Sequence, residues 1–386
     1  MFSLNWTANG RGAALRTDTL KKMADLAKSQ GLDALLATSP ENFAYLSGFT
    51  VPSHHILRWR HSMLLVRPDC SVGVFTVDME ASTVEKKLPG VPLTAWGEFT
   101  ENSMDGLAQM LVDHGLVRGT IGLEMDYLPA QDLESLKINL PSVKFVPAQD
   151  LFNRARMIKT PREIDALQRL SRISDQSIAE SLSLAGAGSS EMDIASSLTH
   201  GIYSRGAQDF KFMIIATGER SQLPNVGPTS RLLQESDICR VEIFSIIDGY
   251  HAGVCRTAAV KKPPRHAERI WKILSDATKR LVELIRPGAS SREIYEAYLK
   301  MIAKLEMPPI AFVGHGIGQH LHEDPYLGGS GDWELKPGMV MGIEPLIYET
   351  GYGFGMQNKD MVAVTESGCL LLSDHTDTTD LFICGV

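Results

Sequence analysis

Three histidines and a glutamate lie close together in residues 313–325, which read V-G-H-G-I-G-Q-H-L-H-E-D-P. His315 has a glycine on each side, so a ligand can approach the backbone closely at this point. Imidazole and carboxylate groups at this spacing can transfer protons, bind a substrate or hold a metal ion. A surface loop with solvated histidines is the structural alternative, and the clustering favours a site.

A predicted hairpin supplies further polar groups. Residues 237–260 predict two strands around the turn Asp248-Gly249. With the strands paired about that turn, we expect Glu242 to lie opposite Gly253, and His251 to lie on the same face. This face is either a buried acid–histidine pair or part of a site.

An acid also interrupts the apolar strand that we expect at residues 339–348. Glu344 stands inside the run V-M-G-I-E-P-L-I, where a carboxylate is costly unless it is paired or bound to a ligand. Just before the last predicted strand, residues 361–364, Gln357 and Lys359 bring in an amide and a cation. We therefore expect Glu344 to have a partner.

Length and composition limit the partners of these groups. A chain of 386 residues predicts two domains, and 44% hydrophobic and 22% charged residues are typical of globular proteins. A net charge of −8 argues against nucleic acid or an anionic membrane as a partner. No apolar run is long enough to span a bilayer, and residues 1–12 lack the pattern of a signal peptide. Five cysteines without a C-x-x-C pair indicate reduced thiols, so we expect a cytoplasmic protein.

The first 150 residues or so alternate between apolar runs and amphipathic stretches of helical length. This alternation predicts an α/β layer with a largely buried sheet. The expected strands are residues 32–37, 63–66, 72–77, 120–123 and 143–146, and the expected helices begin near residue 17 and cover residues 78–87, 103–114 and 128–137.

The pattern changes near residues 150–159. Thr160-Pro161-Arg162-Glu163 is a capping box with proline at the first helical position, and it predicts a long helix. Further on, the Ser-rich helix start at residues 188–192 is repeated at residues 288–294. The repetition indicates two αβ halves related by approximate symmetry, with chance agreement as the alternative.

The order of these features resembles the superfamily of methionine aminopeptidase, aminopeptidase P, prolidase and creatinase. The resemblance rests on N-F-A-Y-L-S-G-F at residues 42–49, R-M-I-K-T-P-R-E-I at 156–164, I-D-G-Y at 247–250, G-H-G-I-G at 314–318, K-P-G-M-V-M-G-I-E-P at 336–345 and K-D-M-V-A-V-T-E-S-G at 359–368. It implies a creatinase/prolidase-type α/β N-terminal domain, residues 1–153, and an α+β pita-bread catalytic-type domain, residues 154–386.

The resemblance also implies five metal ligands. They fall on Glu242, Gly253, His315, Glu344 and Lys359 of this chain. Glycine offers no ligand, and a protonated lysine has no lone pair and repels a dication. We therefore expect neither a metal site nor a cofactor, although a single ion on Glu242, His315 and Glu344 is a chemical alternative.

Creatinase and ectoine hydrolase are members of this superfamily that work without a dinuclear centre. By that resemblance we expect a metal-independent hydrolase of a C–N bond in a small carboxylated amidine, amide or cyclic substrate. His315 or His322 moves protons, Glu242 or Glu344 orients a water or holds a substrate nitrogen, and Lys359 stabilises an oxyanion. A divergent Xaa-Pro metallopeptidase and a non-catalytic binding module are the alternatives.

Five further residues are expected to bind the substrate. The resemblance places Asn225 and Gln357 where the peptidases carry a histidine and an arginine, and His251 is a replacement for that histidine. Arg58 and Arg60 lie near a position from which creatinase-like enzymes donate a basic residue across a dimer interface to the substrate carboxylate. We therefore expect a small-molecule substrate and a homodimer, with a solvated cluster of charges as the alternative.

Overall fold

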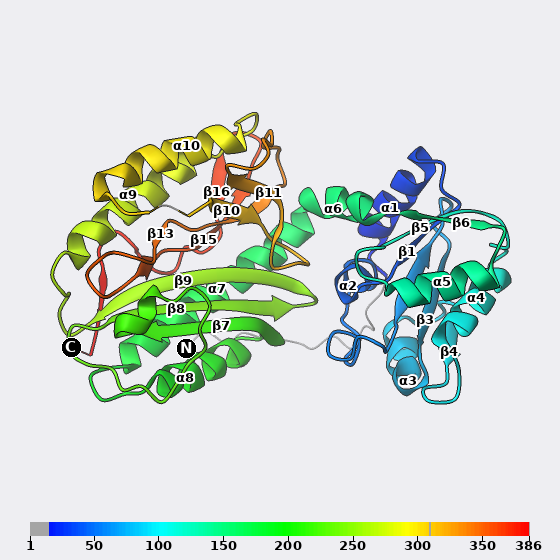
Figure 1. Ribbon diagram of the computed structural model, residues 1–386, viewed down its shortest axis with the longest axis horizontal. Helices are drawn as coiled ribbons and strands as arrows, with labels where there is room; N and C mark the ends of the chain where they lie inside the picture. Colours follow the sequence, from blue (N-terminus) through cyan, green and yellow to red (C-terminus); the bar gives the residue numbers. More distant parts are fainter. Residues whose placement is uncertain (1–14, 309, 386) are drawn as a thin grey trace, which may run out of the picture. The chain divides into compact units, whose positions relative to one another are not determined.

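The chain folds into two compact units, and the boundary between them lies between Ala155 and Arg156 (Figure 1). The computed structural model describes residues 15–308 and 310–385, so residues 1–12, where no signal peptide was expected, lie outside the described residues. In the described residues, no helix combines the length and the apolar composition that a bilayer crossing requires.

The N-terminal unit is built on a mixed sheet with the strand order β4-β3-β2-β1-β5-β6. Its strands are β1 (Ala34–Ala37), β2 (Met63–Val66), β3 (Val72–Val77), β4 (Leu93–Trp96), β5 (Gly119–Leu123) and β6 (Val143–Pro147). Its helices are α1 (Thr17–Ser29), α2 (Pro40–Ser47), α3 (Asp78–Lys87), α4 (Ser103–Asp113) and α5 (Ala130–Asn139), and α6 (Gln149–Met157) continues across the boundary into the second unit.

Both faces of this sheet are covered, as its apolar runs predict. In β1, Leu35 packs in the cluster that contains α1 and α2, whereas Leu36 packs in the cluster that contains α4. This alternation follows from the two-residue period of a strand. The expected strands and helices are confirmed, but α2 and the half-exposed edge strand β4 were not expected. The start signal of α2 was present, because Ser39 caps the helix and Pro40 is its first residue.

The C-terminal unit contains two larger sheets and four long helices in the described residues. One sheet has the order β17-β9-β8-β7, the second has β11-β10-β12-β15-β16, and β13 and β14 form a small ribbon. The helices are α7 (Pro161–Leu184), α8 (Glu191–Ser204), α9 (Ala267–Leu284) and α10 (Ser291–Ile302). The strands are β7 (Asp209–Thr217), β8 (Ile238–Ile247), β9 (Tyr250–Val260), β10 (Phe312–Gly316), β11 (Glu323–Gly328), β12 (Val340–Ile343), β13 (Leu346–Ile347), β14 (Met356–Gln357), β15 (Asp360–Val364), β16 (Cys369–Leu371) and β17 (Phe382–Cys384).

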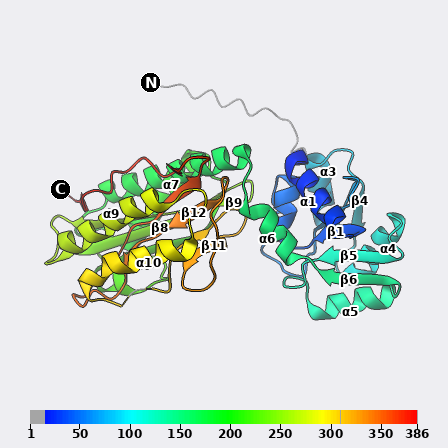
Figure 2. The same cartoon turned by 90° about the horizontal axis from the view of Figure 1, so that it is seen from above.

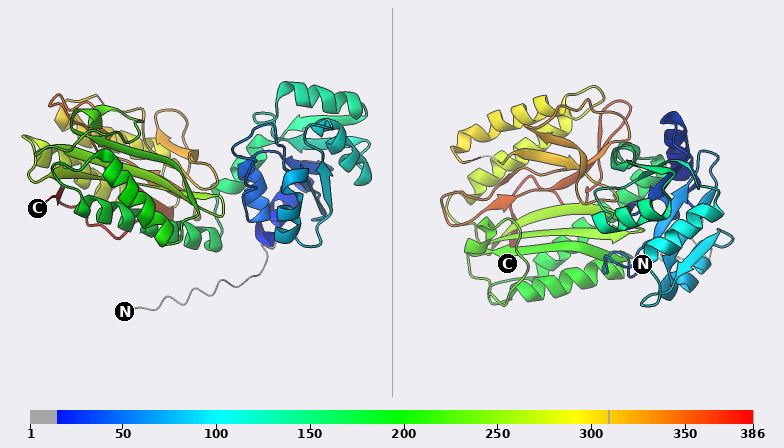
Figure 3. Two further views of the ribbon diagram at one scale, coloured as in Figure 1. Left: turned by 90° about the horizontal axis from the view of Figure 1, so that it is seen from below. Right: turned by 45° about the vertical axis from the view of Figure 1, so that its right-hand side comes forward.

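The helices of this unit lie on its outside. Helices α9 and α10 pack on the sheet of β10, β12 and β15 (Figure 2), and α7 and α8 pack on the sheet of β7, β8 and β9 (Figure 3). The inner faces of the two sheets are thus left to line a site. The predicted start of α7 is confirmed, because the Thr160 side chain accepts from Glu163 N and Glu163 accepts from Thr160 N.

The two Ser-rich helix starts of the predicted repeat are confirmed. Ser190 caps α8 and Ser290 caps α10, and each side chain accepts a hydrogen bond from the backbone N–H three residues later. Each serine also forms an isolated bridge to a later segment, at Leu232 and at Glu334. The two halves therefore share the same connection between helix start and returning loop.

The register of the β8–β9 hairpin differs from the expectation. Glu242 pairs with Cys255, and Gly253 pairs with Phe244 instead of with Glu242. The reason is the turn: Asp248 and Gly249 both have positive φ, 51° and 82°, so the residues that flank them close the hairpin. The predicted pairing was wrong by two residues, and an even shift leaves each side chain on its predicted face.

Candidate active site

A cavity of about 370 Å³ lies in the C-terminal unit, and half of the site residues predicted from the sequence line it: Asn225, Glu242, His322, Glu344 and Lys359. Its walls are largely apolar, and its polar groups come from the loop after β7, from β8, and from the segments around β11, β12 and β15. The lining residues are Phe212, Ile214, Pro224, Asn225, Glu242, Phe244, Ile310, Phe312, Leu321, His322, Glu344, Leu346, Tyr348 and Lys359.

The Lys359 ammonium is the centre of the polar groups. Its Nζ lies 3.0 Å from His315 Nε2, 3.2 Å from Glu344 Oε2 and 3.3 Å from Glu242 Oε1. An ammonium carries three N–H groups, so each has an acceptor from the protein. The ring of Phe244 covers the group, with its centroid 4.6 Å from Nζ. Donation to an oxyanion, the role expected for Lys359, therefore requires the loss of one of these contacts.

Buried charges hold the backbone of Lys359 in place. Lys359 exchanges backbone hydrogen bonds with Cys255, and the Arg256 guanidinium donates to Lys359 O at 2.9 Å. Arg256 also forms ion pairs with Asp175 at 2.9 Å and with Asp360 at 2.8 Å. Burial lowers the pKa of Arg256, but the two carboxylates outweigh burial and raise it overall. These contacts therefore fix the position of the Lys359 backbone.

Glu344 and Lys359 lie side by side, and each shifts the pKa of the other. Burial alone raises the pKa of Glu344, but the charge of Lys359 outweighs it and brings the pKa to about 2. Burial lowers the pKa of Lys359, and Glu344 and Glu242 outweigh it, so the pKa lies above its usual value. Both groups are therefore charged at neutral pH.

One oxygen of Glu344 has no hydrogen-bond donor among the described residues. Its Oε2 accepts from Gln357 Nε2 at 3.1 Å. Its Oε1 lies 3.2 Å from His315 Nε2, but that contact joins two acceptors. The reason is the tautomer: His315 Nδ1 lies 2.8 Å from Gly316 O and so carries the proton, and Nε2 accepts from Lys359.

His322 lies in the cavity wall, with its ring centroid 4.0 Å from that of His315. Burial, and then the neighbouring His315 and Lys359, lower the pKa of His322 to about 4. The imidazole is therefore neutral at pH 7. It can donate from one ring nitrogen and accept at the other.

The other expected substrate-binding residues are not all in the cavity. Asn225 lines it, and Gln357 lies behind Glu344. His251 is not among the lining residues, and its backbone N–H and ring Nδ1 lie 2.7 and 3.2 Å from Gly318 O. Arg58 and Arg60 belong to the N-terminal unit, where Arg58 donates to Tyr127 O and Arg60 pairs with Glu98 at 2.8 Å.

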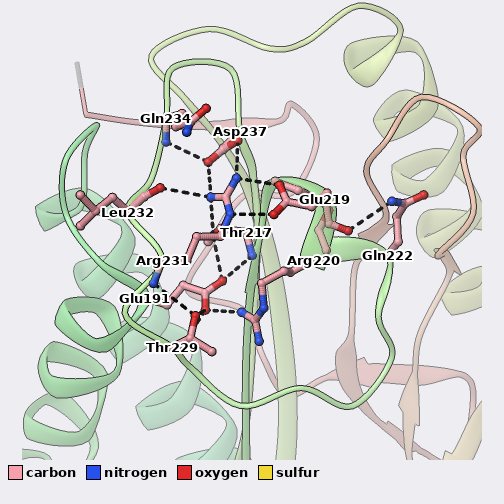
Figure 4. A network of polar contacts seen from close by, with 12 residues as sticks. Glu191, Thr217, Glu219, Arg220, Gln222, Thr229, Arg231, Leu232, Gln234 and Asp237 are labelled. Carbon is pink, nitrogen blue, oxygen red and sulfur yellow. Dashed lines mark hydrogen bonds and ion pairs between the residues drawn. The ribbon is translucent and has the colours of Figure 1, made fainter.

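Asn225 belongs to the loop between β7 and β8, and the polar network in Figure 4 joins this loop to Glu191 of α8. Glu191, at the start of α8, accepts from the backbone N–H groups of Thr217 and Thr229, each at 2.9 Å, and pairs with Arg220. Thr217 is the last residue of β7, Arg220 lies between it and Asn225, and Thr229 follows Asn225 in the loop. One carboxylate therefore holds the chain on both sides of Asn225.

Two residues were missed in the sequence. Arg240 is fully buried and donates to the carbonyls of Leu223 and Pro224 in the loop, and Phe244 packs over Gly253 and Lys359. The signal for the first was present, because an arginine inside the apolar run I-C-R-V-E is as unusual as the glutamate beside it.

The residues at the centre do not fit a dinuclear metal site. In the described residues, no group of three or more His, Cys, Asp or Glu side chains is placed to hold a metal ion. The ammonium of Lys359 stands between the carboxylates, where it repels a dication. A Cβ at Gly253 lies 2.5 Å from the ring of Phe244, so there is no room for an aspartate at this position.

Comparison with known proteins identifies the family. A family model described as Metallopeptidase family M24 matches residues 165–366, more than half of the chain, and one described as Creatinase/Prolidase N-terminal domain matches residues 19–158. The chain belongs to metallopeptidase family M24. A probable dipeptidase PepE of Mycobacterium bovis is 31% identical to this M24 chain over 270 residues, which cover 68% of this chain and 72% of the relative.

Two further relatives extend over nearly the whole chain. An Xaa-Pro dipeptidase of Pyrococcus furiosus is 25% identical over 361 residues, which cover 92% of this chain and 97% of the relative. The crystal structure of X-Pro aminopeptidase from Thermotoga maritima has the same fold, with a TM-score of 0.82, 23% identity, and coverage of 94% of this chain and 99% of that chain.

These relatives confirm part of the interpretation and correct the rest. The superfamily and the fold, an α/β N-terminal domain followed by an α+β pita-bread domain, are confirmed, and the M24 chain is a member of the creatinase/Xaa-Pro peptidase superfamily of hydrolases. The expectation of a metal-independent, creatinase-like hydrolase of amidines or cyclic amides is wrong, because the family is one of metallopeptidases and the relatives are named dipeptidases.

Proposed function

We propose that the protein is a hydrolase of short peptides, of the Xaa-Pro dipeptidase type, with the 370 Å³ cavity as its active site. The observation that carries the proposal is the combination of apolar walls with Asn225, Glu242, His322 and Glu344 in the part of the chain that matches family M24. The volume lies in the range of small-ligand pockets, and apolar walls suit a prolyl ring and a neighbouring side chain.

Each polar residue has a role that its position supports. His322, neutral at pH 7, exchanges a proton with the nitrogen of the peptide bond that breaks. Glu344 Oε1, which has no donor among the described residues, accepts from the attacking water or from a substrate N–H. Asn225 orients the peptide from the opposite loop. Because the residues do not fit a dinuclear centre, no step of this scheme is assigned to a metal ion.

A substrate carboxylate needs a cation that the cavity does not supply. The cation among its lining residues is Lys359, and its three N–H groups already have acceptors. We infer that Arg58 of a second copy binds the carboxylate in a homodimer. Ile56 and Trp59, next to Arg58, are 70% and 61% exposed, which supports a surface that a partner covers.

The dimer is tested by analytical ultracentrifugation. We expect a dimer for the native chain and a monomer for Trp59→Ser, with Phe99→Ser as the control, because Phe99 is an exposed aromatic residue at a different loop. A native monomer at micromolar concentration contradicts the inference.

The described cysteines are all free, which supports the expectation of a cytoplasmic location.

The activity is tested on purified protein with Ala-Pro, Met-Pro, the reversed dipeptide Pro-Ala and Ala-Ala. The loss of each dipeptide and the appearance of its free amino acids are measured by mass spectrometry, in a chelating buffer and with Mn²⁺, Co²⁺ or Zn²⁺ added. We expect cleavage of the Xaa-Pro dipeptides, and a loss of about 100-fold in His322→Asn. The proposal is wrong if no dipeptide is cleaved under any of these conditions.

A further inference from the structure

Arg240 is the largest fully buried side chain of the described residues, and its contacts all lie around the cavity. Its guanidinium donates to the backbone carbonyls of Leu223 and Pro224, the latter at 3.0 Å, and Nη1 donates to Gln357 Oε1 at 3.0 Å. Its Cζ lies 5.0 Å from the ring centroid of Tyr348. One side chain therefore contacts two lining residues, Pro224 and Tyr348, and also Gln357, which lies behind the lining residue Glu344.

The contacts continue from Arg240 to a carboxylate. Gln357 accepts from Arg240 with its oxygen and donates with its amide nitrogen to Glu344 Oε2 at 3.1 Å. The amide is thereby fixed in one orientation, because the guanidinium has only donors and the carboxylate only acceptors. Arg240 thus sets the orientation of Glu344 through one intermediate residue.

A purely structural role does not account for a charged group here. In the described part of the chain, no carboxylate forms an ion pair with Arg240, and a buried cation without one is costly. A buried methionine fills a similar volume at no such cost, but it cannot bind two carbonyls and an amide. The several donors of the guanidinium join the loop, at the carbonyls of Leu223 and Pro224, to Gln357, and no apolar side chain can do this.

We propose that Arg240 is a positioning residue, which fixes the separation between the Asn225 loop and the Glu344 carboxylate for a peptide bound between them. The identity of the ligand rests on the proposed function, but the positioning does not. Arg240 touches neither substrate nor reacting atoms in this proposal. It acts through the loop carbonyls on one side and through Gln357 on the other.

Arg220 provides a matched control. It is also an arginine that holds the same loop, since it donates to Gly227 O at 3.0 Å and pairs with Glu191, but it has no contact with Gln357. If the loop alone matters, Arg240→Met and Arg220→Met act alike. If Arg240 positions Glu344, only Arg240→Met changes the chemistry at the carboxylate.

The kinetic test is a double-mutant cycle on Ala-Pro hydrolysis. We expect Arg240→Met to lower kcat by about 100-fold, the effect of a misplacement of about 1 Å. In the background of Gln357→Leu we expect the same change to cost about ten-fold or less, because the path to Glu344 is already cut. Arg220→Met should raise KM more than it lowers kcat, and additive effects of Arg240 and Gln357 overturn the proposal.

A structural test is independent of turnover. In crystal structures of Arg240→Met, and of Arg240→Lys if the first variant does not fold, we expect the Gln357 amide to leave Glu344 and the Asn225 loop to move by about 1 Å or more. Arg220→Met should move the loop and leave the Gln357–Glu344 hydrogen bond intact. An unchanged hydrogen bond and loop without the guanidinium overturn the proposal, even if the protein cleaves no dipeptide.

Discussion

Replacing Lys359 by methionine removes the cation that three buried acceptors surround. The pKa of Glu344 is held at about 2, against 4.5 for the free group, chiefly by Lys359 acting against burial. At about 1.4 kcal/mol for each pKa unit, this contribution to the free energy of unfolding is on the order of 3 kcal/mol at pH 7. The loss in Lys359→Met is therefore expected to be about 3–5 kcal/mol, the range for a broken buried ion pair.

The sign of the pH dependence follows from the lowered pKa. The contribution is fully present above about pH 4.5, where the unfolded carboxylate is ionised, and it is lost as the pH falls toward 2. The difference in stability between the native protein and Lys359→Met should therefore shrink as the pH falls from 4.5 to 3. Urea denaturation followed by circular dichroism measures the stability of both proteins.

Lys272→Met is the control for this experiment. Lys272 forms an ion pair with Asp276 on α9, but both side chains are more than half exposed, so its loss should cost less than about 0.5 kcal/mol. A Lys359→Met variant as stable as Lys272→Met refutes the assignment of Lys359 as the cation of the site. A loss that is the same at pH 3 as at pH 7 refutes the linkage to Glu344.

Further predictions concern the metal ligands, the histidine and the loop. The double variant Gly253→Asp with Lys359→Glu should bind Mn²⁺ only when Phe244→Ala is added, because the smaller side chain makes room for the new carboxylate. Elemental analysis measures the bound metal, and binding by the double variant without Phe244→Ala shows that the steric argument is wrong. In the pH profile of kcat/KM, the acidic limb due to His322 should lie near pH 4, because activity needs the neutral ring. An acidic limb near pH 6.5 contradicts the lowered pKa of His322. Glu191→Gln should raise KM and destabilise the protein by about 1–3 kcal/mol, measured by dipeptide kinetics and thermal unfolding, since four or more donors share that carboxylate; unchanged values remove it as the clamp of the loop.

Local signals predicted much of the fold. The capping box at Thr160, the period-two alternation of β1 and the Ser-rich starts of α8 and α10 each act over a few neighbouring residues, so the sequence contains them directly. The register of the hairpin failed for a different reason. It depends on the backbone angles of Asp248 and Gly249, and the two-residue turn that they form was recognised but its closing pair was misplaced.

The site was predicted as a set of residues but not as a set of contacts. Glu242, His315, Glu344 and Lys359 were singled out from their residue types and surroundings, the family resemblance assigned them to one site, and the structure brings all four together. Which acceptors the ammonium would take depends on side-chain packing across strands β8, β10, β12 and β15. Arg240 stands out in its apolar run, but its role was not predicted, because the backbone carbonyls that it binds have no signature in the sequence.

The interlocking of Phe244, Gly253 and Lys359 has an evolutionary consequence. An aspartate at 253 meets the Phe244 ring, and a glutamate at 359 leaves three carboxylates without the ammonium that neutralises them. Each single step toward the ligand set of the metallopeptidases is therefore less stable than its starting point. A change from one kind of site to the other is therefore expected to need several substitutions at the same time.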